Sequence, residues 1–121
     1  MVEEKRRYIR WETKTRVAYA LNKDDDLYKE VFTADISEKG LQILTNVKLE
    51  LEQILYLKLE FMSDSVPVVA EGKVVYLKIE EGKYRVGLEF TKMDDFQMQR
   101  LKRCLEDIRK EFEREAKKRY G

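Results

Sequence analysis

Residues 54–61 read Ile-Leu-Tyr-Leu-Lys-Leu-Glu-Phe, a run of mostly apolar and aromatic side chains that strongly predicts a β-strand. Similar runs lie on both sides of it and are separated by polar turns. Short strands separated by turns at this spacing predict a small antiparallel barrel. The predicted strands cover residues 16–21, 27–36, 41–45, 54–61, 66–79 and 84–90.

The connections between these strands carry their own predictions. The turn that ends at Gly40 is rich in Asp and Ser, and we expect Gly40 to adopt a left-handed conformation there. The polar connection over 46–53 is expected to direct Leu49 and Leu51 inward. Gly72, in the middle of a predicted strand, indicates a bulge or a close backbone contact.

From Asp94 the apolar residues change to a spacing of three and four, which predicts one face of an α-helix over 94–120. Asp94 or Asp95 is the predicted N-cap. The stripe has two possible roles: it closes the open side of the barrel, which we favour, or it forms a helix–helix seam in a dimer. The stripe consists of Met98, Leu101, Leu105, Ile108 and Phe112.

Composition limits the function classes open to this chain. Its 121 residues predict one domain, and a net charge of only +1 disfavours a globally basic nucleic-acid binder. There is no histidine, no P-loop and no dinucleotide-binding glycine motif, so we expect neither an enzyme nor a metal site. The single cysteine, Cys104, precludes an internal disulfide and is predicted to be a small buried or flanking residue rather than a nucleophile. No apolar run is long enough for a membrane span or a signal segment, so we expect a cytoplasmic protein without membrane insertion.

Two polar clusters, far apart in the sequence, carry the chemistry of a candidate site. Three arginines lie within five residues near the N-terminus, and the guanidinium fork fits phosphate oxygens or the edge of guanine and can stack on a purine face. The turn at 35–40 offers a carboxylate for ring N–H groups, a hydroxyl, and a glycine that lets a ligand come close. Together the clusters predict an anionic ligand that contains guanine. The candidate ligand-binding residues are Arg6, Arg7, Arg10, Asp35, Ser37 and Gly40.

This arrangement resembles the signature of the PilZ domain family. Its first part is Arg-x-x-x-Arg, formed by Arg6 and Arg10, and its second part is the Asp-x-Ser-x-x-Gly of residues 35–40. The Val-Gly-Leu-Glu-Phe run at 86–90, followed by a polar-capped helix, is also similar, and the resemblance covers about residues 5–108. It implies a mainly β fold: a six-stranded antiparallel split barrel, with a C-terminal α-helix, that binds the bacterial second messenger cyclic di-GMP.

The resemblance also implies roles for individual residues. The two signature arginines would engage guanine faces, guanine edges and phosphates, while Asp35 and Ser37 would read a guanine edge and Gly40 would form the turn beside it. Arg7 is an additional candidate phosphate ligand. No residue of the signature is missing, which disfavours a family member that does not bind the nucleotide.

The predicted organisation is a single PilZ-like domain over 1–121, with a flexible basic arm at 1–10, the barrel at 11–91 and a long helix at 94–120. The helix runs beyond the minimal domain of the family. Because the sequence leaves no room for an attached output domain, we expect signalling through an unidentified protein partner or through a homo-oligomer formed by the helix.

Two other function classes stay open. A small barrel can bind single-stranded nucleic acid with stacking aromatic residues, and Tyr8, Trp11 and Tyr19 lie near arginines. The near-zero net charge and the many Glu residues disfavour this class. The other class is a structural or assembly subunit that acts through its C-terminal helix without a nucleotide.

Overall fold

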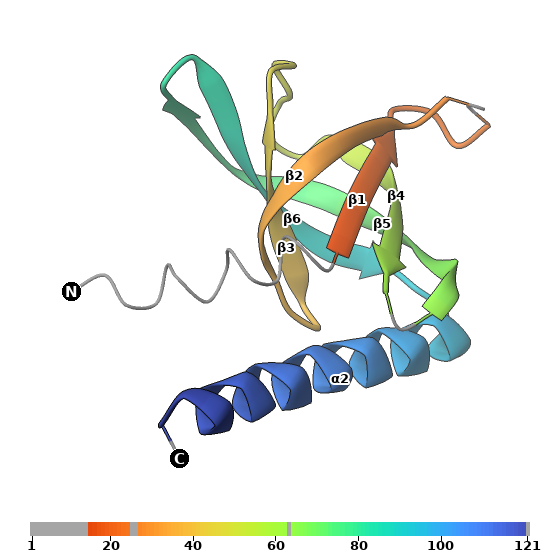
Figure 1. Ribbon diagram of the computed structural model, residues 1–121. Coiled ribbons are helices and arrows are strands. Elements are labelled where there is room, and N and C mark those ends of the chain that lie inside the picture. The colour runs from red at the N-terminus through yellow and green to blue at the C-terminus, as the bar shows by residue number, and fades with distance from the viewer. Residues whose placement is uncertain (1–14, 25–26, 63, 121) are drawn as a thin grey trace.

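In the described part of the chain, six antiparallel strands close into a barrel in the order β1-β2-β3-β6-β5-β4, and the helix α2 lies across an end of it (Figure 1). The computed structural model describes residues 15–24, 27–62 and 64–120. The predicted fold, a six-stranded antiparallel barrel with a long C-terminal helix, is confirmed. The elements are β1 (Thr15–Ala20), β2 (Lys29–Ile36), β3 (Gly40–Thr45), β4 (Ile54–Phe61), β5 (Asp64–Glu80), β6 (Lys83–Lys92) and α2 (Asp95–Tyr120).

Alternation along each strand separates the inside of the barrel from the outside. In β4, Leu55, Leu57 and Leu59 are completely buried, whereas Lys58 and Glu60 are exposed. This is the period-two pattern of a strand with one face on the core. The inward side chains from all six strands form one apolar core, which includes Val17, Tyr19, Ile36, Leu41, Ile43, Leu57, Val68, Val74, Val86 and Leu88.

Tyr19 is the polar exception in this core. Its ring is buried, and its hydroxyl lies 3.2 Å from the Thr45 Oγ1, so the phenol oxygen has a hydrogen-bond partner inside the barrel. A buried ring cannot stack on a base. Tyr19 is therefore not available for base stacking in a nucleic-acid-binding barrel. The other two candidate aromatic residues, Tyr8 and Trp11, lie outside the described residues.

Several local expectations differ from the structure. Leu51 was expected to point inward but is 57% exposed, whereas Leu49 is buried as predicted. The connection turns back at Glu52, which has a φ of 73° and donates its N–H to the carbonyl of Val74 on the distant strand β5. The bulge predicted near Gly72 is present, but its extra residue is Thr91 on the partner strand β6. Gly72 also makes the predicted close contact, since a Cβ there would lie 3.0 Å from the Leu57 side chain.

The helix α2 closes one end of the barrel, which is the role that the sequence favoured. Asp94 caps it, accepting a hydrogen bond of 2.8 Å from the Gln97 N–H on Oδ1. One face of α2 places Leu101 and Cys104 in the core, where both are buried, as predicted for Cys104. Met98, Leu105 and Ile108 pack against the same core and are partly buried. Figure 1 shows the last turns of α2 running past the barrel.

Polar contacts fasten the start of α2 to β5. The pairing of β5 with β6 begins only at Glu71, so the backbone before it needs other partners on that side. The Gln97 side-chain oxygen, Oε1, accepts the Val69 N–H, and the buried Arg100 donates to the backbone oxygens of Val66 and Pro67. These two side chains of α2 thus replace a missing strand partner, which sets the position of the helix on the barrel.

Candidate functional site

The turn between β2 and β3 brings the second signature cluster together. Glu38 and Lys39 form its tip, and the Ser37 N–H donates to the Gly40 carbonyl at 2.9 Å, closing a tight hairpin. The Ser37 hydroxyl lies 3.4 Å from the same carbonyl oxygen and accepts the Lys39 N–H at 3.2 Å. Ser37 is exposed, so its oxygen stays accessible from solvent. Figure 1 shows this turn at the end of the barrel that α2 covers.

Gly40 is required at this turn for a reason other than the predicted one. A left-handed conformation was expected, but the only glycine with a positive φ among the described residues is Gly82. Gly40 is instead the first residue of β3, paired with Glu89 of β6. A Cβ at position 40 would lie 2.0 Å from the Leu88 carbonyl oxygen, so the space beside the β6 backbone excludes any side chain. The expected conformation was wrong, and close backbone approach is the physical reason for the glycine.

Asp35 lies on the outer face of the barrel, two residues before the turn. The register of β2 with β3 shifts between Thr33 and Asp35, which marks a bulge. Thr33 and Ile36 are buried, whereas Asp35 is half-buried and opposite Gln42. The bulge therefore directs the Asp35 carboxylate out of the core, on the same hairpin as Ser37 and Gly40.

The first signature cluster is not covered by the structure. Arg6, Arg7 and Arg10 lie outside the described residues, as does the rest of the predicted arm. Their role in ligand binding therefore stays a prediction.

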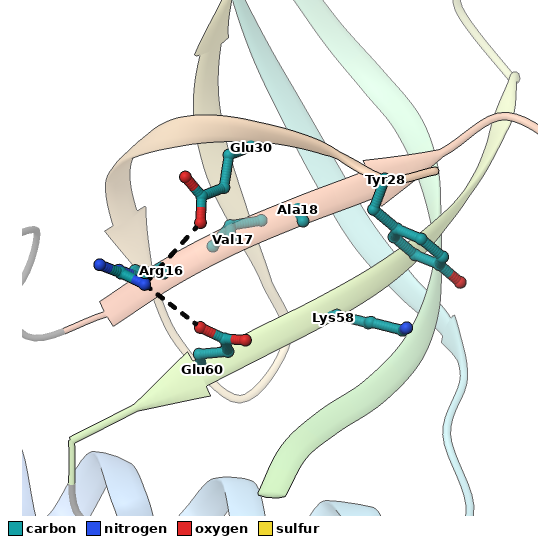
Figure 2. Close-up of a pocket in the computed structure, with 7 residues that line it drawn as sticks. All are labelled: Arg16, Val17, Ala18, Tyr28, Glu30, Lys58 and Glu60. Carbon is teal, nitrogen blue, oxygen red and sulfur yellow. Dashed lines mark ion pairs between the residues drawn. The ribbon is translucent and has the colours of Figure 1, made fainter. Parts of the chain in front are cut away.

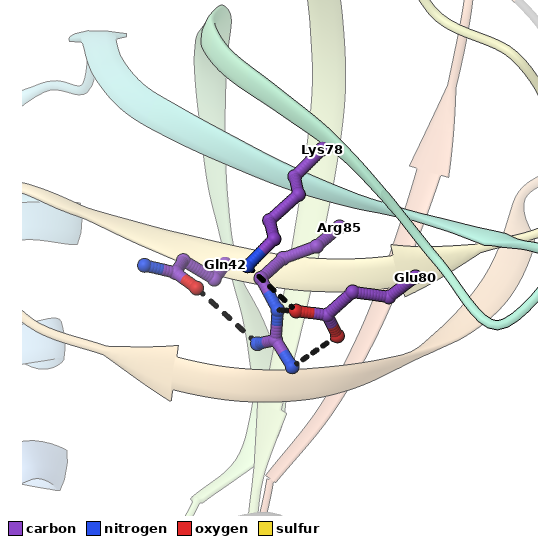
Figure 3. Close-up of polar contacts among 4 residues, drawn as sticks. All are labelled: Gln42, Lys78, Glu80 and Arg85. Atoms are coloured by element: carbon purple, nitrogen blue, oxygen red, sulfur yellow. Dashed lines mark hydrogen bonds and ion pairs between the residues drawn. The ribbon is translucent and has the colours of Figure 1, made fainter.

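A polar cluster on the neighbouring strands was missed by the sequence analysis. Arg85 on β6 donates from Nε and Nη2 to the two carboxylate oxygens of Glu80, at 3.1 and 2.9 Å, and from Nη1 to Gln42 Oε1 at 3.3 Å (Figure 3). The Lys78 Nζ lies 3.6 Å from Glu80. These residues come from three strands, and only the register of β3, β6 and β5 brings them together.

The hydrogen bonds from Arg85 lower the pKa of the Glu80 carboxyl below its ordinary value of 4.5, partial burial opposes that shift, and the positive charges of Arg85 and Lys78 add to it. Because the pKa is depressed in the folded state, the ionised carboxylate stabilises the fold above about pH 4.5, and this contribution is lost as the pH falls through the lower folded-state value. We expect Glu80→Gln to lower the melting temperature at neutral pH and to match the parent in strong acid. Thermal unfolding between about pH 3 and 7 measures this, with Glu81→Gln at the exposed hairpin tip as control. If Glu80→Gln lowered the melting temperature by the same amount throughout that pH range, the lowered pKa of Glu80 would be contradicted.

A separate pocket of about 330 Å³ lies on the outer face of β1, β2 and β4 (Figure 2). Arg16 lies between Glu30 and Glu60, at 4.0 and 3.9 Å, and the Lys58 amine lies 4.3 Å from the centre of the Tyr28 ring. Such exposed ion pairs contribute little to stability. The residues lining this pocket include neither Asp35 nor any other described member of the predicted site. Among the described residues, no group of His, Cys, Asp or Glu side chains is arranged to hold a metal ion.

Comparison with known protein families identifies the family to which this chain belongs. The family model described as the PilZ domain matches residues 4–107, a span that contains both parts of the two-part signature. The chain belongs to the PilZ domain family. PilZ domains are typically cyclic di-GMP-binding effectors, and they are generally receptors without catalytic activity. No curated protein matches this sequence at a significant level.

Solved structures share the PilZ fold of this chain at low sequence identity. The structure of the Bacillus subtilis inhibitor of motility (MotI/DgrA) superposes with a TM-score of 0.65 at 14% identity, covering 84% of this chain and 49% of that one. K. pneumonia MrkH in its apo state gives a TM-score of 0.68 at 16% identity, with coverages of 84% and 49%. This chain therefore spans about half the length of the structures it resembles. In the part of this PilZ chain that the structure describes, helices with the length and apolar character of a membrane span are absent.

Proposed function

We propose that this PilZ domain is a cyclic di-GMP-binding effector. The observation that carries the proposal is the hairpin of Asp35, Ser37 and Gly40, which holds an outward carboxylate and an exposed hydroxyl on a backbone too close to β6 for any side chain at position 40. The carboxylate can accept hydrogen bonds from the ring and amino N–H groups of guanine. The family match over both parts of the signature supports the same ligand.

The arginines of the N-terminal arm complete the proposed site. Arg6 and Arg10 would hold phosphates and the O6/N7 edge or the face of a guanine, with Arg7 as a further phosphate ligand. In this mechanism the ligand draws the arm against the turn at 35–40. The combined surface of arm and barrel is then what a protein partner recognises. Since ordering the arm costs conformational entropy, the cation–phosphate contacts must offset that cost.

Arg6→Ala and Arg10→Ala test the site directly. We expect each to weaken cyclic di-GMP binding by at least about tenfold, because one bidentate arginine contact contributes about 1–3 kcal/mol. The melting temperature of the ligand-free protein should stay nearly unchanged. Isothermal titration calorimetry measures the affinity and the number of ligands bound. Higher salt should weaken binding by the parent, because phosphate charges are being neutralised.

Arg16→Ala is the matched control, since it removes one arginine from the outer face of β1, where Arg16 pairs with Glu30 and Glu60. It should bind cyclic di-GMP like the parent. Binding by both arm variants as tight as that of the parent would exclude the arm from the site. A parent that gives no binding heat with cyclic di-GMP would refute the proposed function itself.

A further inference from the structure

The β5–β6 hairpin carries an unpaired strand edge beyond the barrel. The pairing of β5 with β4 ends at Lys73, and the last backbone contact on that side joins Val74 to the connection before β4. The pairing of β5 with β6 continues to Glu80. In the described part of the chain, residues 75–80 therefore have a strand neighbour on one side only. Figure 1 shows this hairpin extending past the barrel at the end away from α2.

The backbone groups of Leu77 and Ile79 point toward this open edge. On β6, the carbonyl of Leu88 points toward β3, because a Cβ on Gly40 would lie 2.0 Å from its oxygen. Backbone groups alternate between the two sides of a strand, so those of the β6 residues two and four positions earlier also face β3. These two residues are the partners of Leu77 and Ile79. Leu77 and Ile79 thus direct their N–H and C=O groups away from β6.

The side chains along this edge alternate between apolar and charged. Ile79 is 71% exposed, and its neighbours Lys78 and Glu80 project together from the opposite face of the strand (Figure 3). An open edge with an exposed apolar residue is a template for a further strand. The order Lys-Ile-Glu is complementary to itself in an antiparallel pair, because Lys78 of one copy then lies opposite Glu80 of the other.

One two-fold register satisfies both the backbone and the charges. An axis at Ile79 places this residue opposite its own copy, where the outward N–H and C=O groups exchange two hydrogen bonds. An axis at Lys78 brings two ammonium groups together, which is unfavourable. An axis at Leu77 places Ile79 opposite Val75, in the bulge where the register of β5 with β6 shifts. The bulge on one side and the hairpin turn on the other confine the pairing to one short segment.

We infer that the free edge of β5 over residues 77–80 joins two copies of this chain, so that their hairpins form one four-stranded antiparallel sheet in the order β6-β5-β5-β6. The partner is a second copy because a two-fold contact requires a self-complementary surface. Ile79 packs on Ile79 of the other copy. Each Lys78 meets a Glu80 carboxylate, whose oxygens have lone pairs beyond those that accept from Arg85. Because the paired strands are antiparallel, the two barrels lie at opposite ends of the shared sheet.

Air oxidation of Ile79→Cys tests the contact at its axis. In a hydrogen-bonded antiparallel pair the two Cα atoms lie about 5.5 Å apart, which a disulfide can span. We expect Ile79→Cys to form a disulfide-linked dimer at least about tenfold faster than Leu27→Cys, because pairing raises the local concentration of the second thiol. Leu27 is the control position, since it is 88% exposed in the β1–β2 connection. The native Cys104 is buried, and the parent controls for it.

Sedimentation equilibrium measures the dimer without a cross-link. We expect the average mass of the parent to rise toward two chains with concentration, and Lys78→Glu and Ile79→Pro to raise the dissociation constant at least about tenfold. Lys78→Glu sets like charges opposite each other twice across the axis. Ile79→Pro removes an edge N–H that the β5–β6 ladder does not use. Lys23→Glu makes the same charge change in the β1–β2 connection and should dimerise like the parent. Thermal unfolding verifies that each variant is folded.

All these measurements are made without nucleotide, so their outcome is separate from that of cyclic di-GMP binding. A parent that stays a single chain at every concentration refutes the contact, as does equally fast cross-linking of Ile79→Cys and Leu27→Cys. If the parent dimerises and folded Lys78→Glu and Ile79→Pro dimerise equally well, the edge is refuted and another surface, such as the apolar stripe of α2, joins the copies. Ile79→Pro is therefore also the background in which concentration-dependent stability reports on α2.

Discussion

Replacing Gly40 by alanine is expected to destabilise the fold by at least about 3 kcal/mol, because the new Cβ would lie 2.0 Å from the carbonyl oxygen of Leu88. That oxygen belongs to the β6 backbone, which cannot rotate away as a flexible side chain can. Relief requires separating the start of β3 from β6, where Gly40 pairs with Glu89 and the Phe90 N–H donates to the Lys39 carbonyl at 2.9 Å. Urea-induced unfolding measures the loss.

Gly82→Ala is the matched control for Gly40→Ala. Gly82 has a φ of 81°, and no atom lies within 4 Å of the place a Cβ would occupy. The substitution there costs only the strain of a left-handed alanine, about 1 kcal/mol. A Gly40→Ala loss no larger than that of Gly82→Ala would show that the backbone around β3 relaxes freely.

The Gly40 substitution should also affect the proposed site. The Gly40 carbonyl accepts from both the N–H and the hydroxyl of Ser37, so a shift of β3 displaces the hydroxyl that we propose contacts the ligand. We therefore expect Gly40→Ala to lose measurable cyclic di-GMP binding together with stability. Gly82→Ala should keep its affinity.

Truncating Leu101 to alanine is expected to cost about 3 kcal/mol, because this side chain is completely buried where α2 closes the barrel. Removing it leaves a cavity lined by strands that cannot collapse onto the helix. Leu105→Ala, one turn further along the same stripe, should cost clearly less, since Leu105 is only partly buried. Urea-induced unfolding of both variants measures the two losses.

The same pair of variants separates the two roles that the apolar stripe could have. If the stripe closes the barrel, Leu101→Ala lowers stability to the same extent at every protein concentration. If the stripe were instead a seam between two copies, the stability of the parent would rise with protein concentration. Equal losses for Leu101→Ala and Leu105→Ala would contradict the burial seen in the structure.

Much of the fold could be read from local patterns. The run of apolar and aromatic residues at 54–61 predicted β4, and the change to a spacing of three and four after Asp94 predicted α2 with its cap. Positions where a long-range contact overrides local chemistry were not predictable in this way. Leu51 was misassigned because a hydrogen bond from Glu52 to β5 turns the connection outward.

The candidate site divides in the same manner. Its residue types, Asp35, Ser37 and Gly40, were identifiable because they lie close together in the sequence and share one turn. The physical reason for a glycine at position 40 was not identifiable from the sequence, since it depends on a carbonyl of β6 nearly fifty residues away. The contacts of Arg85 with Gln42 and Glu80 were missed because only the register of β3, β6 and β5 brings these residues together.

By itself, the sequence determined the barrel class, the terminal helix and the family signature. Each of these depends on short-range periodicity or on short motifs of residues that lie close together in the sequence. Tertiary structure decided which way the strands face after each bulge, which side chains share the outer surface and which backbone approaches another. A single extra residue at Val75 reverses the direction of Tyr76, and one missing Cβ at Gly87 supplies the space that its ring covers. Such effects arise from the pairing of distant strands, so no local pattern encodes them.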